Sequence, residues 1–250
     1  MGKFLNCKSG FTLAEVLVTL GIIGVVSAMT IPTLMQNHQK KVYITELHKV
    51  YNEFQQAALA QITSRNAINL TEAGVRSDAA MGTFIRNQFK VVKDCTGDPT
   101  DCLADSYTNM DGGTATTYSD TSAPCFALAS GAVFCAKYGL GAKTGGLIDS
   151  NLTYNIIGNL IVDTNGKSGP NVIGRDLFIM GIYPDGTLSY ASNLGQLQQQ
   201  PNPGGSTGSL HPIDTASTLK KCQRATLVKT NSDASYCFDV ILDNNWEMNY

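Results

Sequence analysis

The stretch Gly10-Phe11-Thr12-Leu13-Ala14-Glu15 opens a run of apolar and small residues that continues to Met35. Between Lys8 and Lys40 the only formal charge at neutral pH is that of Glu15. A segment of this length and composition can span a bilayer as a helix of about 20 residues. An acidic residue inside such a segment is costly to insert into lipid, so its presence indicates a function.

The order of charge, glycine and apolar residues differs from that of a secretory signal peptide, whose cleavage site follows the apolar run. Here Lys8-Ser9-Gly10 and Phe11-Thr12-Leu13-Ala14-Glu15 precede the apolar run. This order resembles the class III leader of type IV pilins and of the pseudopilins of type II secretion systems. The resemblance implies processing by prepilin peptidase, with cleavage between Gly10 and Phe11 and methylation of the new amino-terminal Phe11.

The resemblance continues beyond the cleavage point. Gly21, Gly24 and Pro32 stand where this family carries glycine or small residues and a helix-loosening proline. Two residues depart from the family pattern, Ala14 where a branched apolar residue is commoner and Thr19 in the apolar run, and neither alters the cleavage motif or the charge. The resemblance assigns a role in assembly to four residues: Phe11, Glu15, Gly24 and Pro32.

The helical period continues past the apolar segment. Apolar residues recur at three- and four-residue steps with polar residues between them, which predicts an amphipathic helix. The apolar series is Val42, Tyr43, Leu47, Val50, Tyr51, Phe54, Ala58 and Ile62. We expect one long rod that is interrupted at Pro32, because proline lacks an N–H and crowds the carbonyl four residues back. A permanently kinked anchor is one interpretation; the resemblance favours a helix that loosens between Gly24 and Pro32 when the subunit leaves lipid.

The remainder of the chain predicts a globular part. We expect an α+β, pilin-like fold in which the long helix packs on an antiparallel sheet. A second helix is predicted from Ser77, a good N-cap residue, to Val92. Strand-like runs flank the Ser130-Gly131 turn and recur at 155–162, 177–183 and 187–190, whereas 95–123 and 195–209 have the composition of loops. The predicted segments are 1–10 as cleaved leader, 11–36 as transmembrane and polymerisation helix, 37–65 as its amphipathic continuation, and 66–250 as ectodomain.

The seven cysteines become six once Cys7 leaves with the leader. An even number in an exported domain predicts disulfides, and six cysteines allow fifteen pairings that sequence alone leaves open. Proximity in the chain and the predicted hairpin favour Cys95 with Cys102, Cys125 with Cys135, and Cys222 with Cys237. A zinc site is the disfavoured alternative, because Cys95 and Cys102 are spaced too widely for a half-site and no histidine pair accompanies them.

Signatures of catalysis are missing from the sequence. It contains three histidines and no G-x-S-x-G, H-E-x-x-H or phosphate-binding G-x-x-x-x-G-K motif. We therefore expect no enzyme activity, with an ectodomain enzyme tethered by a pilin-like anchor as a distant alternative. After loss of Lys3 and Lys8 the mature chain has 16 basic and 20 acidic residues. This net negative charge does not indicate nucleic-acid binding, although it leaves open a local basic patch that captures DNA.

Calcium is the single candidate cofactor. The string from Asp163-Thr164-Asn165-Gly166 to Asp176 resembles a loop that recurs in pilin-like ectodomains, and calcium-binding loops occur in major pseudopilins. Side-chain oxygens of Asp163, Asn165 and Asp176 would be the ligands of the hard cation. The spacing departs from the EF-hand pattern and no glutamate closes it. The alternative is a tight turn at Asn165-Gly166 in which both aspartates bond loop amides.

Taken with the resemblance, these features imply a prepilin-like structural subunit of a type IV pilus or a type II secretion pseudopilus, most consistent with a minor subunit. Its partners would be other pilins or pseudopilins, prepilin peptidase and an inner-membrane assembly platform. It would cross the bacterial inner membrane once, with the amino terminus in the cytoplasm, where Lys3 and Lys8 hold the leader. The alternative function is a binding module at the filament tip, either an adhesin or a DNA-capture subunit.

Overall fold

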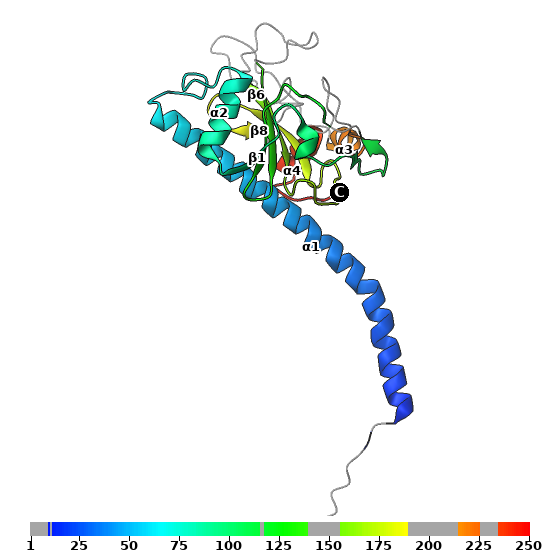
Figure 1. Ribbon diagram of the computed structural model, residues 1–250. Coiled ribbons are helices and arrows are strands. Elements are labelled where there is room, and N and C mark those ends of the chain that lie inside the picture. Colours follow the sequence, from blue (N-terminus) through cyan, green and yellow to red (C-terminus); the bar gives the residue numbers. More distant parts are fainter. Residues whose placement is uncertain (1–9, 11, 116–117, 140–155, 190–214, 226–234) are drawn as a thin grey trace, which may run out of the picture. The chain divides into compact units, whose positions relative to one another are not determined.

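The computed structural model describes Gly10 and residues 12–115, 118–139, 156–189, 215–225 and 235–250. Contacts divide the chain into two compact units, Met1–Val42 and Tyr43–Tyr250. In the described ranges the helices are α1 (Leu13–Ser64), α2 (Asp78–Gln88), α3 (Thr215–Gln223), α4 (Ser235–Asp243) and the short 3-10 helix η1 (Pro99–Asp101) (Figure 1). The strands are β1 (Val91–Asp94), β2 (Tyr107–Thr108), β3 (Thr114–Ala115), β4 (Cys125–Leu128), β5 (Val133–Tyr138), β6 (Gly158–Asp163), β7 (Leu177–Ile182) and β8 (Leu188–Ser189).

Helix α1 contains Pro32 within its 52 residues. The expected interruption at Pro32 is therefore wrong for this structure: helical backbone lies on both sides of the proline. A single proline removes one N–H donor from the helix ladder, and the remaining ladder can hold the helix together. Because the helical conformation persists here, any loosening near Pro32 has to come from a change of surroundings.

The first half of α1 exposes its apolar side chains on every side. Leu13 is 80% exposed, Met29 73% and Leu34 71%, so the exposed residues are not confined to one stripe. By length and composition α1 is the one helix in the described ranges that could cross a membrane. The two threonine hydroxyls at 19 and 30 donate to the helix carbonyls of Val16 and Val26, at 3.0 and 2.9 Å. These bonds explain why hydroxyl residues are tolerated in the apolar run.

The second half of α1 buries one face in the core of the Tyr43–Tyr250 unit. Its buried residues are Leu47, Val50, Phe54, Ala57, Ala58 and Gln61. Phe54 meets Phe84 of α2 with ring centroids 5.7 Å apart, and Tyr51 meets Trp246 near the carboxyl terminus at 5.0 Å. The buried face is the one that the sequence predicted, except that Val42 is 37% exposed.

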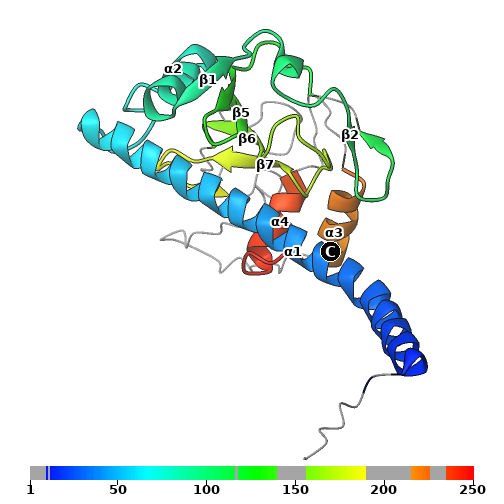
Figure 2. The same cartoon turned by 60° about the horizontal axis from the view of Figure 1, so that its bottom comes forward.

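A six-stranded antiparallel sheet has the order β1-β4-β5-β6-β7-β8. The predicted α+β fold, a long helix with an antiparallel sheet, is confirmed. Figures 1 and 2 show the second half of α1 running along the sheet, with α2 beside its carboxyl end. Helix α4 contacts β7, and α3 lies against α4. In the described part of the carboxyl-terminal segment, which was expected to fold back onto the sheet, α4 does so.

Two boundaries differ from the prediction. Helix α2 ends at Gln88 rather than at Val92, because Phe89 takes an extended conformation and its N–H caps the carbonyl of Ile85. Residues Val91–Asp94 instead pair with β4. The predicted loop 95–123 contains η1 and the β2–β3 hairpin in its described part. At Val91–Asp94 a pairing with a distant strand prevails over the local helix preference.

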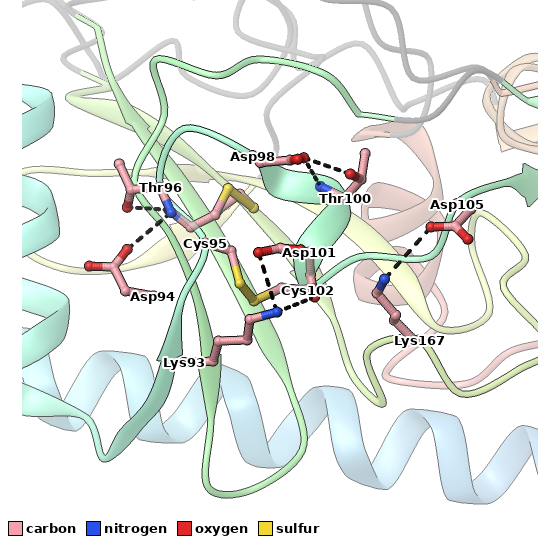
Figure 3. The surroundings of a disulfide bond; sticks show 12 residues. Lys93, Asp94, Cys95, Thr96, Asp98, Thr100, Asp101, Cys102, Asp105 and Lys167 are labelled. Carbon is pink, nitrogen blue, oxygen red and sulfur yellow. Dashed lines mark hydrogen bonds and ion pairs between the residues drawn. A yellow bond between two sulfur atoms is a disulfide. The ribbon is translucent and has the colours of Figure 1, made fainter.

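Three disulfides join Cys95 to Cys102, Cys125 to Cys135, and Cys222 to Cys237. These are the pairs that chain proximity favoured. Cys125 and Cys135 are directly opposite in the β4–β5 hairpin, and Cys222 and Cys237 join α3 to α4. Around the first disulfide, Lys93 pairs with Asp101 at 3.4 Å and donates to its carbonyl at 3.0 Å, as Figure 3 shows.

We expect no reactive thiol in the mature, exported protein. The uncleaved precursor is the matched control, because it adds Cys7 alone and should show one. Replacing both Cys222 and Cys237 with serine should lower the free energy of unfolding by about 3 kcal/mol, the chain-entropy value for a loop of roughly 15 residues. Thiol labelling of the denatured, unreduced protein checks the pairing, and six reactive thiols in the mature form would contradict it.

Candidate functional site

The amino terminus of α1 is closed by a reciprocal pair of side chains. Thr12 precedes the first helical residue, and its backbone N–H and hydroxyl both donate to Glu15 Oε2 at 2.8 Å. In return, the N–H of Glu15 donates to Thr12 Oγ1 at 3.2 Å. This arrangement is a capping box, in which residues three apart satisfy N–H groups that the first helical turn leaves without partners.

The sequence analysis missed this box, although its signal was present. Thr12-Leu13-Ala14-Glu15 has the T-x-x-E spacing that marks a helix start before an apolar run. From the sequence, Glu15 is predicted to act in assembly, and its capping partner is not predicted. The box shows that the Glu15 carboxylate also has a local partner, Thr12. The first helical residue is therefore Leu13, which directly follows Thr12.

The other predicted assembly residues lie along or just before the same helix. Gly10 is exposed and outside α1, while Phe11 falls outside the described residues. At Gly24 an added Cβ would meet no heavy atom within 4 Å, so this glycine leaves open surface on the helix. Pro32 lies inside α1. The roles of Gly10, Gly24 and Pro32 in processing and assembly therefore stay predictions.

A second polar cluster lies where β6 ends and β7 begins. Asp163 and Asp176 are both fully buried. The Tyr107 hydroxyl donates to Asp163 Oδ2 at 2.5 Å, and the N–H of Asn165 donates to Asp163 Oδ1 at 3.1 Å. The N–H groups of Asn171 and Val172 donate to the two oxygens of Asp176, at 2.7 and 2.8 Å. All four carboxylate oxygens thus accept hydrogen bonds from the chain, as the tight-turn alternative expects.

Burial dominates the electrostatics of these two aspartates. It raises the pKa of Asp163 to about 7, although the hydrogen bond from Tyr107 opposes the shift, and the nearby charge of Asp176 adds to it. Burial also raises the pKa of Asp176 to about 6, against the hydrogen bonds from Val172 and Asn171. Burial therefore favours the neutral form of both acids, and a rise in pH favours their charged forms.

Three side-chain oxygens beside these aspartates are buried and accept no hydrogen bond from the described residues. They are Thr164 Oγ1, Asn165 Oδ1 and Asn171 Oδ1. The amide nitrogens of the two asparagines donate to the carbonyls of Gly169 and Lys167, at 3.2 and 3.4 Å. Oxygens without donors are what a hard cation takes as ligands. The hydrogen bonds of the two aspartates fit the tight turn, and the oxygens without donors fit a cation site. Calcium binding at Asp163, Asn165 and Asp176 stays a prediction.

Calcium should raise the thermal midpoint of the full-length protein at pH 8, relative to the same protein with excess chelator. A cation that binds only the folded state stabilises it by about 2.7 kcal/mol at a hundredfold excess over Kd. The shift should vanish in Asp163→Ala and persist in the control Asp185→Ala, whose carboxylate only closes the turn before β8 through Thr187. Equal midpoints in both buffers would leave the loop as a turn without a metal.

The histidines of the described ranges show no catalytic arrangement. His38 and His48 are exposed on α1, and the His48 ring lies against Trp246 with centroids 4.3 Å apart. Within those ranges, no group of three or more His, Cys, Asp or Glu side chains is placed to hold a metal ion. His211 lies outside the described residues.

The comparisons with known proteins bear on the amino-terminal segment. The family model for the prokaryotic N-terminal methylation motif matches residues 5–31, which include the last part of the leader, the capping box and most of the exposed apolar run. This motif is the class III prepilin leader of type IV pilins and pseudopilins. Comparisons with curated proteins and with solved structures gave no match.

Proposed function

We propose that this protein, which carries a prepilin methylation motif at residues 5–31, is a structural subunit of a type IV pilus or a type II secretion pseudopilus. Prepilin peptidase cleaves it between Gly10 and Phe11, and the mature chain assembles through the first half of α1. An inner-membrane platform takes part in this assembly. The ectodomain, residues 66–250, is then displayed on the filament.

One observation carries the proposal: the methylation motif runs directly into the first half of α1, whose large apolar side chains are left uncovered by the described part of the chain. The large apolar residues from Leu13 to Met35 are 44% exposed or more, a far larger apolar surface than a soluble monomer leaves to water. Lipid covers such a surface before assembly, and neighbouring helices cover it in a filament. Membrane anchoring and polymerisation thus use the same residues in turn.

Orientation follows from charge. Lys3 and Lys8 keep the leader on the cytoplasmic side of the inner membrane, so the ectodomain lies outside it. Formation of disulfides in the ectodomain is consistent with an oxidising compartment. The protein is therefore a single-pass inner-membrane protein until it enters a periplasmic or extracellular filament.

The size of the ectodomain favours a minor subunit over a major one. Residues 66–250 include polar, turn-rich stretches at 95–123 and 195–209. Counting this subunit against the other filament proteins by quantitative mass spectrometry tests the assignment. A minor subunit should be vastly outnumbered, whereas a chain that dominates the filament would be the major one.

Mass spectrometry of the mature amino terminus tests processing. We expect residues 1–10 to be absent and Phe11 to carry one methyl group. Gly10→Val should abolish cleavage, because the peptidase meets a branched side chain at the scissile bond, whereas the matched control Gly21→Val should be cleaved like the parent. An intact leader in assembled material, or a cut after Ala28, would overturn the proposed function.

A further inference from the structure

Two lysines stand just beyond the apolar run of α1. Residues 36–39 are polar and exposed, and Lys40 and Lys41 follow them on the same helix. The chain has no acidic residue from Val16 to Thr45, so this stretch carries a net positive charge. We propose that Lys40 and Lys41 bind the headgroups of anionic phospholipids in the leaflet on the ectodomain side of the membrane.

The length of the apolar run brings these lysines to the headgroups. From Leu13 to Met35 the helix rises about 33 Å, at about 1.5 Å per residue. A bilayer has a hydrocarbon core of about 30 Å, with about 5 to 7 Å of headgroups on each side. By the same rise, Lys40 stands about 8 Å beyond Met35. Lysine side chains extend their ammonium groups toward the interface from such positions, and a tilt of the helix brings them nearer to it. Both ammonium groups therefore reach the phosphate layer.

The distribution of charge along the chain calls for an anionic partner at that level. Basic residues are normally concentrated on the cytoplasmic side of a spanning helix. In the proposed orientation Lys3 and Lys8 lie on that side, but they leave with the leader. Lys40 and Lys41 are then the basic side chains nearest to the apolar run. Lys40 makes no ion pair with the described residues. An anionic headgroup supplies the counter-charge at the depth where the helix presents these lysines.

This inference rests on the proposed function, because it takes the first half of α1 as a membrane helix. It adds to the anchoring step a chemical class of lipid. The exposed apolar side chains need only hydrocarbon around them, which every phospholipid offers equally. The lysines, in contrast, distinguish headgroups by their net charge. A preference for anionic over zwitterionic phospholipid is therefore the property that reports on Lys40 and Lys41 alone and not on the apolar run.

Spin-labelled lipids measure this preference in vesicles that contain the full-length protein. Electron paramagnetic resonance separates the lipids that contact the helix from those in the bulk bilayer. The measured quantity is the association of phosphatidylglycerol with the helix divided by that of phosphatidylcholine. Because each lipid meets one lysine at a time, the double variant Lys40→Gln/Lys41→Gln should lower this ratio about fivefold, the factor that one lysine near an anionic surface supplies. Charges elsewhere in the chain are the same in both proteins, so they do not enter the comparison.

Two controls separate the position of the charge from its mere presence. Lys40→Arg/Lys41→Arg should keep the parent ratio, because the positive charge stays. Lys49→Gln should also keep it: Lys49 pairs with Glu53 at 3.8 Å and lies about 12 Å further along α1 than Lys41. That separation exceeds the Debye length of about 8 Å at physiological ionic strength.

Equal ratios for the parent and the glutamine double variant, or an equal loss in Lys49→Gln, would overturn the inference. An absence of helix-bound lipid around the parent protein would be a different result, because it would refute the membrane anchoring in the proposed function itself.

Discussion

Glu15→Val should leave membrane insertion unchanged and lower incorporation into filaments at least about a hundredfold. Insertion does not suffer, because removing an acid from an apolar helix makes transfer into lipid more favourable. Assembly suffers because a neighbouring amine then lies in an apolar filament interior without its counter-charge. Breaking a buried ion pair by removing one partner costs roughly 3 kcal/mol or more, which corresponds to a hundredfold change in the equilibrium.

The matched control for this prediction is Thr19→Val. It also replaces a polar side chain with valine on the same exposed helix, but its hydroxyl bonds only to a carbonyl of its own helix. We expect Thr19→Val to insert and assemble like the parent. Fractionation of membranes and sheared filaments, followed by quantitative mass spectrometry, gives both quantities. A Glu15→Val protein that assembles normally would show that the carboxylate serves the capping box alone.

Gly186→Ala should lower the free energy of unfolding by about 3 kcal/mol or more. Gly186 lies in the turn between β7 and β8 with a φ of +86°, and an added Cβ would stand 2.3 Å from the Cβ of Ala58 in α1. The positive φ costs an alanine about 1 to 2 kcal/mol. The overlap with Ala58 adds an overpacking penalty of about 1 to 3 kcal/mol.

Gly131→Ala separates these two costs. Gly131 has a φ of +95° in the β4–β5 turn, and an added Cβ there meets nothing within 4 Å. We expect Gly131→Ala to lower the free energy of unfolding by the cost of the positive φ alone, about 1 to 2 kcal/mol. Trp246, the single tryptophan, packs against Tyr51 of α1 and reports unfolding by its fluorescence. If the free energy of unfolding fell equally in the two variants, the close contact between the β7–β8 turn and Ala58 of α1 would be contradicted.

Features that depend on residues close in the chain could be predicted from sequence. The order of residues around Gly10 and Phe11 carries the processing motif, and the unbroken apolar run predicts the first half of α1. The three- and four-residue steps from Val42 to Ile62 predict the amphipathic face of its second half. The hairpin that joins Cys125 to Cys135 is equally local, since its turn and its alternating strands lie within eleven residues. The capping box of Thr12 and Glu15 belongs to this group as well, although its signal was overlooked.

Only the tertiary structure decided the pairings between distant residues. Nothing in the polar stretch after Cys95 indicates that Tyr107 bonds Asp163, which is 56 residues further along the chain. The sequence predicts that Val91 and Val92 end a helix, whereas in the structure they belong to β1, which pairs with β4. A hydrogen bond or strand pair of this kind stabilises one conformation only after the whole chain has brought the partners together. Local preferences can therefore predict the long amino-terminal helix, whereas the pairings within the sheet depend on contacts between residues far apart in the chain.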